Sequence, residues 1–173
     1  MTPGPARPVD FHPDRLTIAG RVVTGGALAL LITVFLFKWY GASATSPQTG
    51  LTFSRELNGW HTFTSSRWVW LLTALAGLAL VAEQGGAFEY EGPVPLDLVV
   101  AILGGLSTVL IAYRIIHHPS GAGTVVGSTV TYSFGIKLGI WLAQIAAAAI
   151  AYGGWLAMRE RGATIPAPWN RAG

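Results

Sequence analysis

The sequence predicts an all-α membrane protein, a four-transmembrane-helix bundle with a small β-hairpin-like cap in the first loop. Three observations predict this fold class. Only 11% of the 173 residues are charged, against roughly 25% in soluble domains, and 51% are hydrophobic. The charges are also clustered, which leaves charge-free stretches at 22–37, 68–82, 98–113 and 138–158. Four apolar stretches of this kind indicate four membrane helices.

The expected spans end where charged residues or prolines interrupt the apolar pattern. The third follows Pro95 and carries Asp97 in its first turn, at the positive end of the helix dipole. The fourth is followed by Arg159-Glu160-Arg161. The spans are expected at 17–37, 66–83, 96–116 and 136–158, in a membrane domain at 16–161 between irregular tails at 1–15 and 162–173.

The first loop, residues 38–65, is expected to form the cap. Leu51–Ser54 alternates apolar and polar side chains, and 60–64 is rich in residues that favour strands. The turn dipeptide Asn58-Gly59 lies between them, so we expect two short strands joined there. The alternative is that 60–67 forms the first turns of a longer second helix. The connection at 117–135 is rich in Gly, Ser and Thr.

Small residues recur at every fourth position of the fourth expected span. They are Gly135, Gly139, Ala143, Ala147 and Ala151. In lipid, where no hydrophobic force drives helices together, such a face allows two backbones to approach closely. We expect it to pack within the chain's own bundle, and the alternative is a seam with a second copy or another membrane protein.

Aromatic side chains near the span ends are expected to anchor the helices at the level of the lipid headgroups, because their rings are amphipathic. These residues are Trp39, Tyr40, Trp68, Trp70, Tyr113, Trp155 and Trp169. No cofactor site is expected among them.

Several classes of function are excluded by what the sequence lacks. With no cysteine, the chain has no disulfide, thiolate nucleophile or iron–sulfur ligand. A net charge of only +3 does not indicate a nucleic-acid partner. No ionisable residue falls at an expected midplane, which argues against ion-coupled transport. No hydrolase, kinase, P-loop, dinucleotide or zinc-peptidase motif occurs, so we expect no catalytic residue, cofactor or metal.

The best candidate binding site is a group of cationic and imidazole side chains from two loops. Arg55 and His61 lie in the expected cap, and Arg114 and His117 lie at the end of the third span. These two loops emerge on the same side of the membrane, so the four side chains are candidates to bind an anionic lipid headgroup. The alternative is ordinary surface charge.

The basic residues divide almost evenly between the two sides of the membrane. One side carries Arg7, Arg15, Arg21, Arg159, Arg161 and Arg171, and the other carries Lys38, Arg55, Arg67, Arg114 and Lys137. We expect cytoplasmic termini because the basic residues at both ends lie close to the spans. A folded aromatic cap also suits the outer side.

Four motifs carry a resemblance. They are Phe37-Lys38-Trp39-Tyr40-Gly41, the segment 58–63, Tyr113-Arg114-Ile115-Ile116 and the segment 153–160. Together they resemble small four-span membrane proteins of high-GC Gram-positive bacteria. This resemblance implies a bacterial plasma-membrane location and a folded first loop, and transfers no catalytic residue. The layout is also distantly similar to claudin-like tetraspan proteins, but the paired cysteines of their first loop are missing.

These observations predict a multi-pass plasma-membrane protein that acts without catalysis as an interaction or scaffolding component. The first alternative is an oligomeric channel or small-solute permeation subunit. The second is a protein or enzyme that binds lipid headgroups. The expected partners are membrane lipids and either further copies of the chain or another membrane protein.

Overall fold

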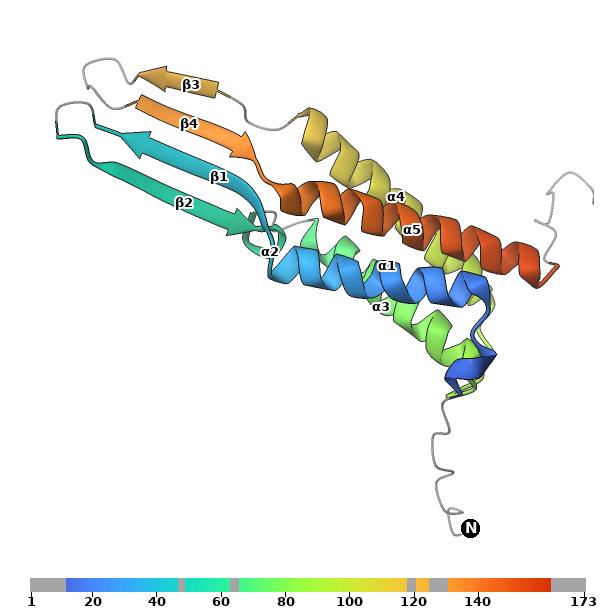
Figure 1. The fold of residues 1–173 in the computed structure, drawn as a ribbon. Helices are drawn as coiled ribbons and strands as arrows, with labels where there is room; N and C mark the ends of the chain where they lie inside the picture. Colours follow the sequence, from blue (N-terminus) through green and yellow to red (C-terminus); the bar gives the residue numbers. More distant parts are fainter. Residues whose placement is uncertain (1–11, 47–48, 63–65, 118–120, 125–130, 163–173) are drawn as a thin grey trace, which may run out of the picture.

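The computed structural model describes residues 12–46, 49–62, 66–117, 121–124 and 131–162. Within them, four long helices lie side by side, and a four-stranded antiparallel sheet extends from one end of the helices (Figure 1). The elements are η1 (Pro13–Arg15), α1 (Ile18–Phe35), β1 (Lys38–Thr45), β2 (Thr52–Asn58), α2 (Gly59–Thr62), α3 (Arg67–Gln84), α4 (Leu96–Ile116), β3 (Gly121–Thr124), β4 (Thr131–Ile136) and α5 (Leu138–Glu160). The expected tails lie mostly outside the described residues.

The fold is therefore mixed α and β, and the expected all-α class, a four-helix bundle with only a hairpin-like cap, is wrong. The strand order is β2-β1-β4-β3. β1 and β4 pair antiparallel at the centre, from Tyr40 opposite Ile136 to Thr45 opposite Thr131. The sheet thus joins the first loop to the third connection, and that Gly- and Ser-rich connection supplies two of its strands.

The first loop also folds differently from the expected hairpin. Its strands are β1 and β2, and the dipeptide Asn58-Gly59 ends a strand and begins α2 instead of turning between strands. The side chain of Asn58 explains this: its Oδ1 accepts from the backbone N–H of His61 at 3.0 Å, as a helix N-cap does. Its Nδ2 also donates to the carbonyl of Phe35 at 2.7 Å. Part of the expected second strand, 63–64, lies outside the described residues.

Three of the described helices, α1, α4 and α5, are long and apolar enough to cross a membrane. The sequence predicts four such helices, and three of the described helices are long and apolar enough. α3 has 18 residues, but Arg67, Glu83 and Gln84 occupy its ends and lower its mean hydropathy. Its middle, 68–82, carries no charge.

Glycines set how closely α5 packs against α4. A Cβ on Gly104 would lie 2.5 Å from the backbone nitrogen of Ala151, and one on Gly154 would lie 2.6 Å from that of Ala101. Contacts this short are possible only without a side chain. The two helices therefore touch backbone to backbone at two levels, and α5 also packs along α1.

The five small residues expected on the fourth span do not all lie on a helix. Gly135 belongs to β4, because α5 begins only at Leu138. Gly139 packs against the carbonyl of Lys38, and Ala143 and Ala147 are fully buried. Ala151 lies against Gly104 of α4. The helical members thus contact other elements of the same chain.

Two tryptophans form the core where the helices meet the sheet. Trp39 of β1 and Trp70 of α3 are fully buried, with ring centroids 4.7 Å apart. The indole N–H of Trp39 donates to the carbonyl of Thr33 at 2.8 Å. These two rings are therefore interior residues rather than anchors facing the headgroups, whereas Trp68 and Tyr113 are exposed.

Candidate functional site

The sheet presents two chemically different faces. Directly paired residues of antiparallel strands place their side chains on the same face. Ser43 pairs with both Ser54 and Ser133, so these hydroxyls define one face, which we call the hydroxyl face. Ala42 pairs with Arg55 and Phe134, and Ala44 pairs with Phe53. The side chains of Ala42, Ala44, Phe53, Arg55 and Phe134 define the opposite face, which we call the aromatic face.

The aromatic face is apolar and open at its outer end. Phe53 is 72% exposed and Phe134 is 46% exposed. In the part of the chain that the structure describes, no carboxylate pairs with Arg55, which lies beside them. An antiparallel sheet normally turns its apolar face to the core and its polar face to water. In this protein both faces reach the surface, and apolar rings around an arginine are typical of a protein-binding surface.

The inner end of the aromatic face is covered by α4. Tyr40 of β1 is buried, and its hydroxyl donates to the carbonyl of Arg114 at 3.1 Å. Burial raises the pKa of Tyr40, and the charge of Arg114 opposes this rise. This contact ties the inner end of the aromatic face to the end of α4.

The hydroxyl face is hydrogen-bonded across its strands. The Ser43 and Ser133 hydroxyls lie 2.7 Å apart, and those of Thr45 and Thr52 lie 3.1 Å apart. These bonds join β1 to both neighbours and stiffen the sheet without a covering layer.

A charged cluster lies where the hydroxyl face meets the helices. Glu56 of β2 forms ion pairs with Lys38 of β1 and, at 3.3 Å, with Lys137 at the start of α5. Hydrogen bonds from Lys38 and then Lys137 hold the pKa of Glu56 below its ordinary value. Two cations share one carboxylate, so the cluster carries a net positive charge.

The lowered pKa of Glu56 predicts a pH dependence. Because its pKa is lower in the folded chain than in the unfolded chain, the carboxylate stabilises the fold fully above its ordinary pKa, and this contribution is lost as pH falls through the lowered value. We expect the Glu56 carboxyl to titrate below the ordinary glutamate range in a ¹³C NMR titration. In Lys38→Gln the midpoint should move back upwards, and an unchanged midpoint would contradict the pairing.

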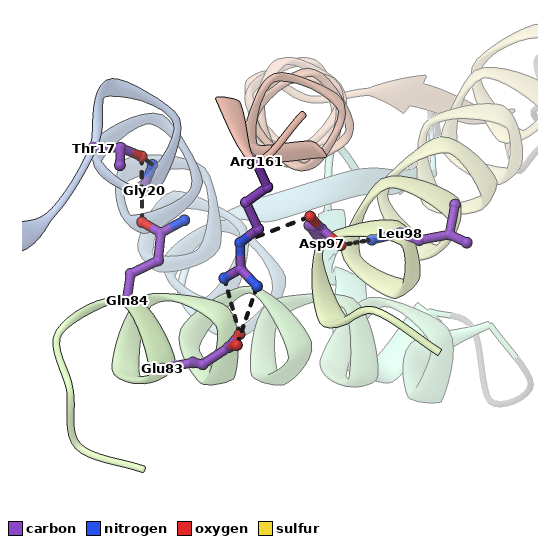
Figure 2. A network of polar contacts seen from close by, with 7 residues as sticks. All are labelled: Thr17, Gly20, Glu83, Gln84, Asp97, Leu98 and Arg161. Atoms are coloured by element: carbon purple, nitrogen blue, oxygen red, sulfur yellow. Dashed lines mark hydrogen bonds and ion pairs between the residues drawn. The ribbon is translucent and has the colours of Figure 1, made fainter. Parts of the chain in front are cut away.

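A second polar cluster ties the helix ends that lie farthest from the sheet (Figure 2). Arg161, just after α5, donates from two nitrogens to Glu83 of α3, each at 3.2 Å. Its Nε also lies 3.9 Å from Oδ2 of Asp97 in α4. The Asp97 side chain is only 1% exposed, and its other oxygen accepts from the N–H of Leu98 at 2.8 Å. Three helix ends are thus joined through one guanidinium.

The same end is linked to α1 by a weaker contact. The hydroxyl of Thr17 caps α1 by accepting from Gly20 N–H at 3.2 Å, and it also reaches Gln84 of α3 at 3.4 Å (Figure 2). This cluster satisfies helix ends with each other's side chains, which is a structural role.

The four residues expected to bind a headgroup each have contacts of their own in the structure. Arg55 points from the aromatic face, and His61 of α2 hydrogen-bonds through Nδ1 to Asn58 at 2.7 Å. Arg114 lies beside Tyr40 at the end of α4, and the ring of His117 stacks on that of Tyr113. None of these contacts links Arg55 or His61 to Arg114 or His117.

Strands β3 and β4 were the part of the site that sequence reasoning missed, whereas the strand expected at Leu51–Ser54 overlaps β2. In the sequence, Tyr132, Phe134 and Ile136 alternate with Ser133 and Gly135. This period of two is the signal that could have identified β4. Its flanking glycines and serines made the whole segment look like a plain loop.

Comparison with known proteins gives no match, either to a family model or to a curated protein of similar sequence. The function is therefore argued from the chain's own geometry.

Proposed function

We propose that this chain is a non-enzymatic interaction protein of the bacterial plasma membrane, in which the helices hold the sheet outside the lipid and the aromatic face binds a partner protein. The observation that carries the proposal is that Phe53 is exposed on the same face of the sheet as Arg55, whose side chain is also exposed. The bacterial membrane is what the resemblance of the sequence motifs implies.

The pairing of β1 with β4 supports a crossing by α3 in addition to α1, α4 and α5. β1 and β2 precede α3, while β3 and β4 follow α4, yet all four belong to one sheet. Both strand pairs must lie on one side of the membrane. If α4 crosses, α3 must cross as well, because a single crossing would place the two pairs on opposite sides.

The contacts along the length of α3 agree with this proposal. Near the sheet, Trp70 packs on Trp39, and at the other end Glu83 pairs with Arg161. About a third of the way along α3, the hydroxyl of Thr73 lies 2.7 Å from that of Ser107, so α3 meets the middle of α4. With four crossings, α1 separates the N-terminus from the sheet and α5 separates the C-terminus from it, so both termini lie on the side of the membrane opposite the sheet. If the sheet lies outside the cell, both termini are cytoplasmic.

The chemistry of the aromatic face defines the partner. The ring of Phe53 is 72% exposed and would pack against an apolar surface, and the guanidinium of Arg55 would pair with a carboxylate within that surface. Phenylalanine and arginine are common at the centres of protein interfaces, where charged pairs are shielded from water. We therefore propose a partner whose surface is apolar with an acidic residue at its centre.

Photo-crosslinking tests this proposal with neighbouring positions of one strand. A photoreactive phenylalanine at Phe53 is expected to give a discrete protein adduct in native membranes, and the same probe at Ser54, on the hydroxyl face, is the matched control. Arg55→Glu should lower the adduct yield from position 53 about tenfold, as loss of a central interface residue does. Equal yields at 53 and 54, or adducts that ignore Arg55→Glu, would overturn the proposal.

A further inference from the structure

A groove between α1 and α5 lies next to a pocket that is lined by the charged cluster of Lys38, Glu56 and Lys137. The groove has a volume of about 420 Å³ and its walls are almost wholly apolar. A second, more polar pocket of about 360 Å³ follows, and Lys38, Lys137 and Glu56 line it. Phe37 lines both, so the two spaces lie next to each other at this residue.

Small side chains keep the groove open. Nothing lies within 4 Å of a Cβ built on Gly25, whereas the neighbouring Gly26 is held against Ile150 of α5. Close packing at Gly26 thus forms the floor of the groove, and the absence of a side chain at Gly25 leaves its mouth open. Ala29 of α1 and Ala149 of α5, which also have small side chains, line the same groove.

The dimensions and charge suit one kind of molecule. From Gly25 to the end of α1 at Phe35 is about 15 Å at 1.5 Å per residue, which is close to the hydrocarbon depth of one leaflet. At the sheet end of the groove, Lys38 and Lys137 are 60% and 46% exposed and share the single carboxylate of Glu56. One negative charge added there would neutralise the cluster.

We propose that this groove is a binding site for an anionic phospholipid of the sheet-side leaflet, with an acyl chain along Gly25 and Ala29 and the phosphate between Lys38 and Lys137. The inference requires α1 and α5 to cross the membrane but does not depend on the partner of the aromatic face. It differs from the headgroup site expected at Arg114 and His117, which lie at the end of α4.

Native mass spectrometry of the full chain, released from nanodiscs of equimolar phosphatidylglycerol and phosphatidylcholine, tests the site. The wild-type protein is expected to retain one phosphatidylglycerol in preference to phosphatidylcholine. Lys38→Gln and Lys137→Gln should each lower this preference about fivefold, because each lysine near the lipid surface contributes separately. Glu56→Gln should raise it, since both lysines then face the phosphate. A misfolded protein would lose the lipid, so a raised preference for phosphatidylglycerol in Glu56→Gln cannot come from misfolding.

The apolar part of the site is tested by filling it. Gly25→Leu is expected to abolish retention of the lipid, and Gly105→Leu of α4, also a position with nothing within 4 Å, should leave it unchanged. Equal retention of the two lipids by the wild-type protein would overturn the proposal. Loss of a dimer or of a bound protein in Gly25→Leu, with lipid retention unchanged, would also overturn it and assign the groove to a helix.

Discussion

Gly104→Leu is expected to destabilise the folded chain by about 3 kcal/mol or more, because it forces α4 and α5 apart. A Cβ at this position would lie 2.5 Å from the nitrogen and 2.7 Å from the Cα of Ala151. Both are backbone atoms, so no side-chain rotation relieves the contact, and α4 must move away from α5. Equilibrium unfolding in mixed micelles measures the loss.

Gly105→Leu is the matched control for Gly104→Leu. It adds the same side chain one residue later, where nothing lies within 4 Å of the new Cβ. The free energy of unfolding should change by no more than about 0.5 kcal/mol. Equal losses in the two variants would show that helix separation is not set by the Gly104–Ala151 contact.

Arg161→Met is expected to cost about 2 kcal/mol, somewhat less than Gly104→Leu. It leaves the buried carboxylate of Asp97 without its cation and removes both hydrogen bonds to Glu83. Breaking a fully buried pair costs about 3–5 kcal/mol, and the value is lower for this pair because Arg161 is 41% exposed. The measurement is again unfolding in mixed micelles.

A double-mutant cycle separates this charge effect from lost packing. Asp97→Asn removes the uncompensated charge, so adding it to Arg161→Met should recover part of the lost stability, although Asp97→Asn alone is destabilising. Arg159→Met is the control, because the Arg159 guanidinium lies over the exposed ring of Trp155, 4.8 Å from its centroid, and contributes about 1 kcal/mol or less. Strictly additive costs for Arg161 and Asp97 would contradict the cluster.

The long helices could be predicted from the sequence because charge and apolar length are local properties. The four long helices occupy the charge-free stretches, and Asp97 lies in the first turn of α4, where the helix dipole favours an acidic residue. The end of α1 is less apparent, since the apolar run continues through Phe37 while the helix ends at Phe35. The residues that follow Phe35 already lead into β1.

The four-stranded sheet could not be predicted from either loop alone, because its two central strands, β1 and β4, pair with each other from loops far apart in the chain. β1 reads as Lys-Trp-Tyr-Gly-Ala-Ser-Ala-Thr, which has little alternation, and its central position depends on pairing with β4 about ninety residues later. Propensity says little about such non-local pairing. The aromatic face was missed for the same reason: Phe53 and Phe134 come to lie on one face of the sheet only after both strands pair with β1.

Asn58-Gly59 shows how one side chain can decide between two local structures. The dipeptide favours a turn between strands, and the sequence on either side is compatible with a hairpin. In the fold, the Asn58 side chain bonds both to the end of α1 and to the start of α2. These tertiary contacts outweigh the local preference.

Cysteine accessibility tests most directly the central claim that the helices hold the sheet outside the cell. The chain has no cysteine of its own, so Ser54→Cys, Glu89→Cys and Gly162→Cys each introduce a single thiol. With a membrane-impermeant maleimide, Ser54→Cys should be labelled in intact cells, and Glu89→Cys and Gly162→Cys only after permeabilisation. Labelling of Ser54→Cys and Glu89→Cys from the same side would contradict four crossings, and labelling of Gly162→Cys but not Ser54→Cys in intact cells would contradict the orientation.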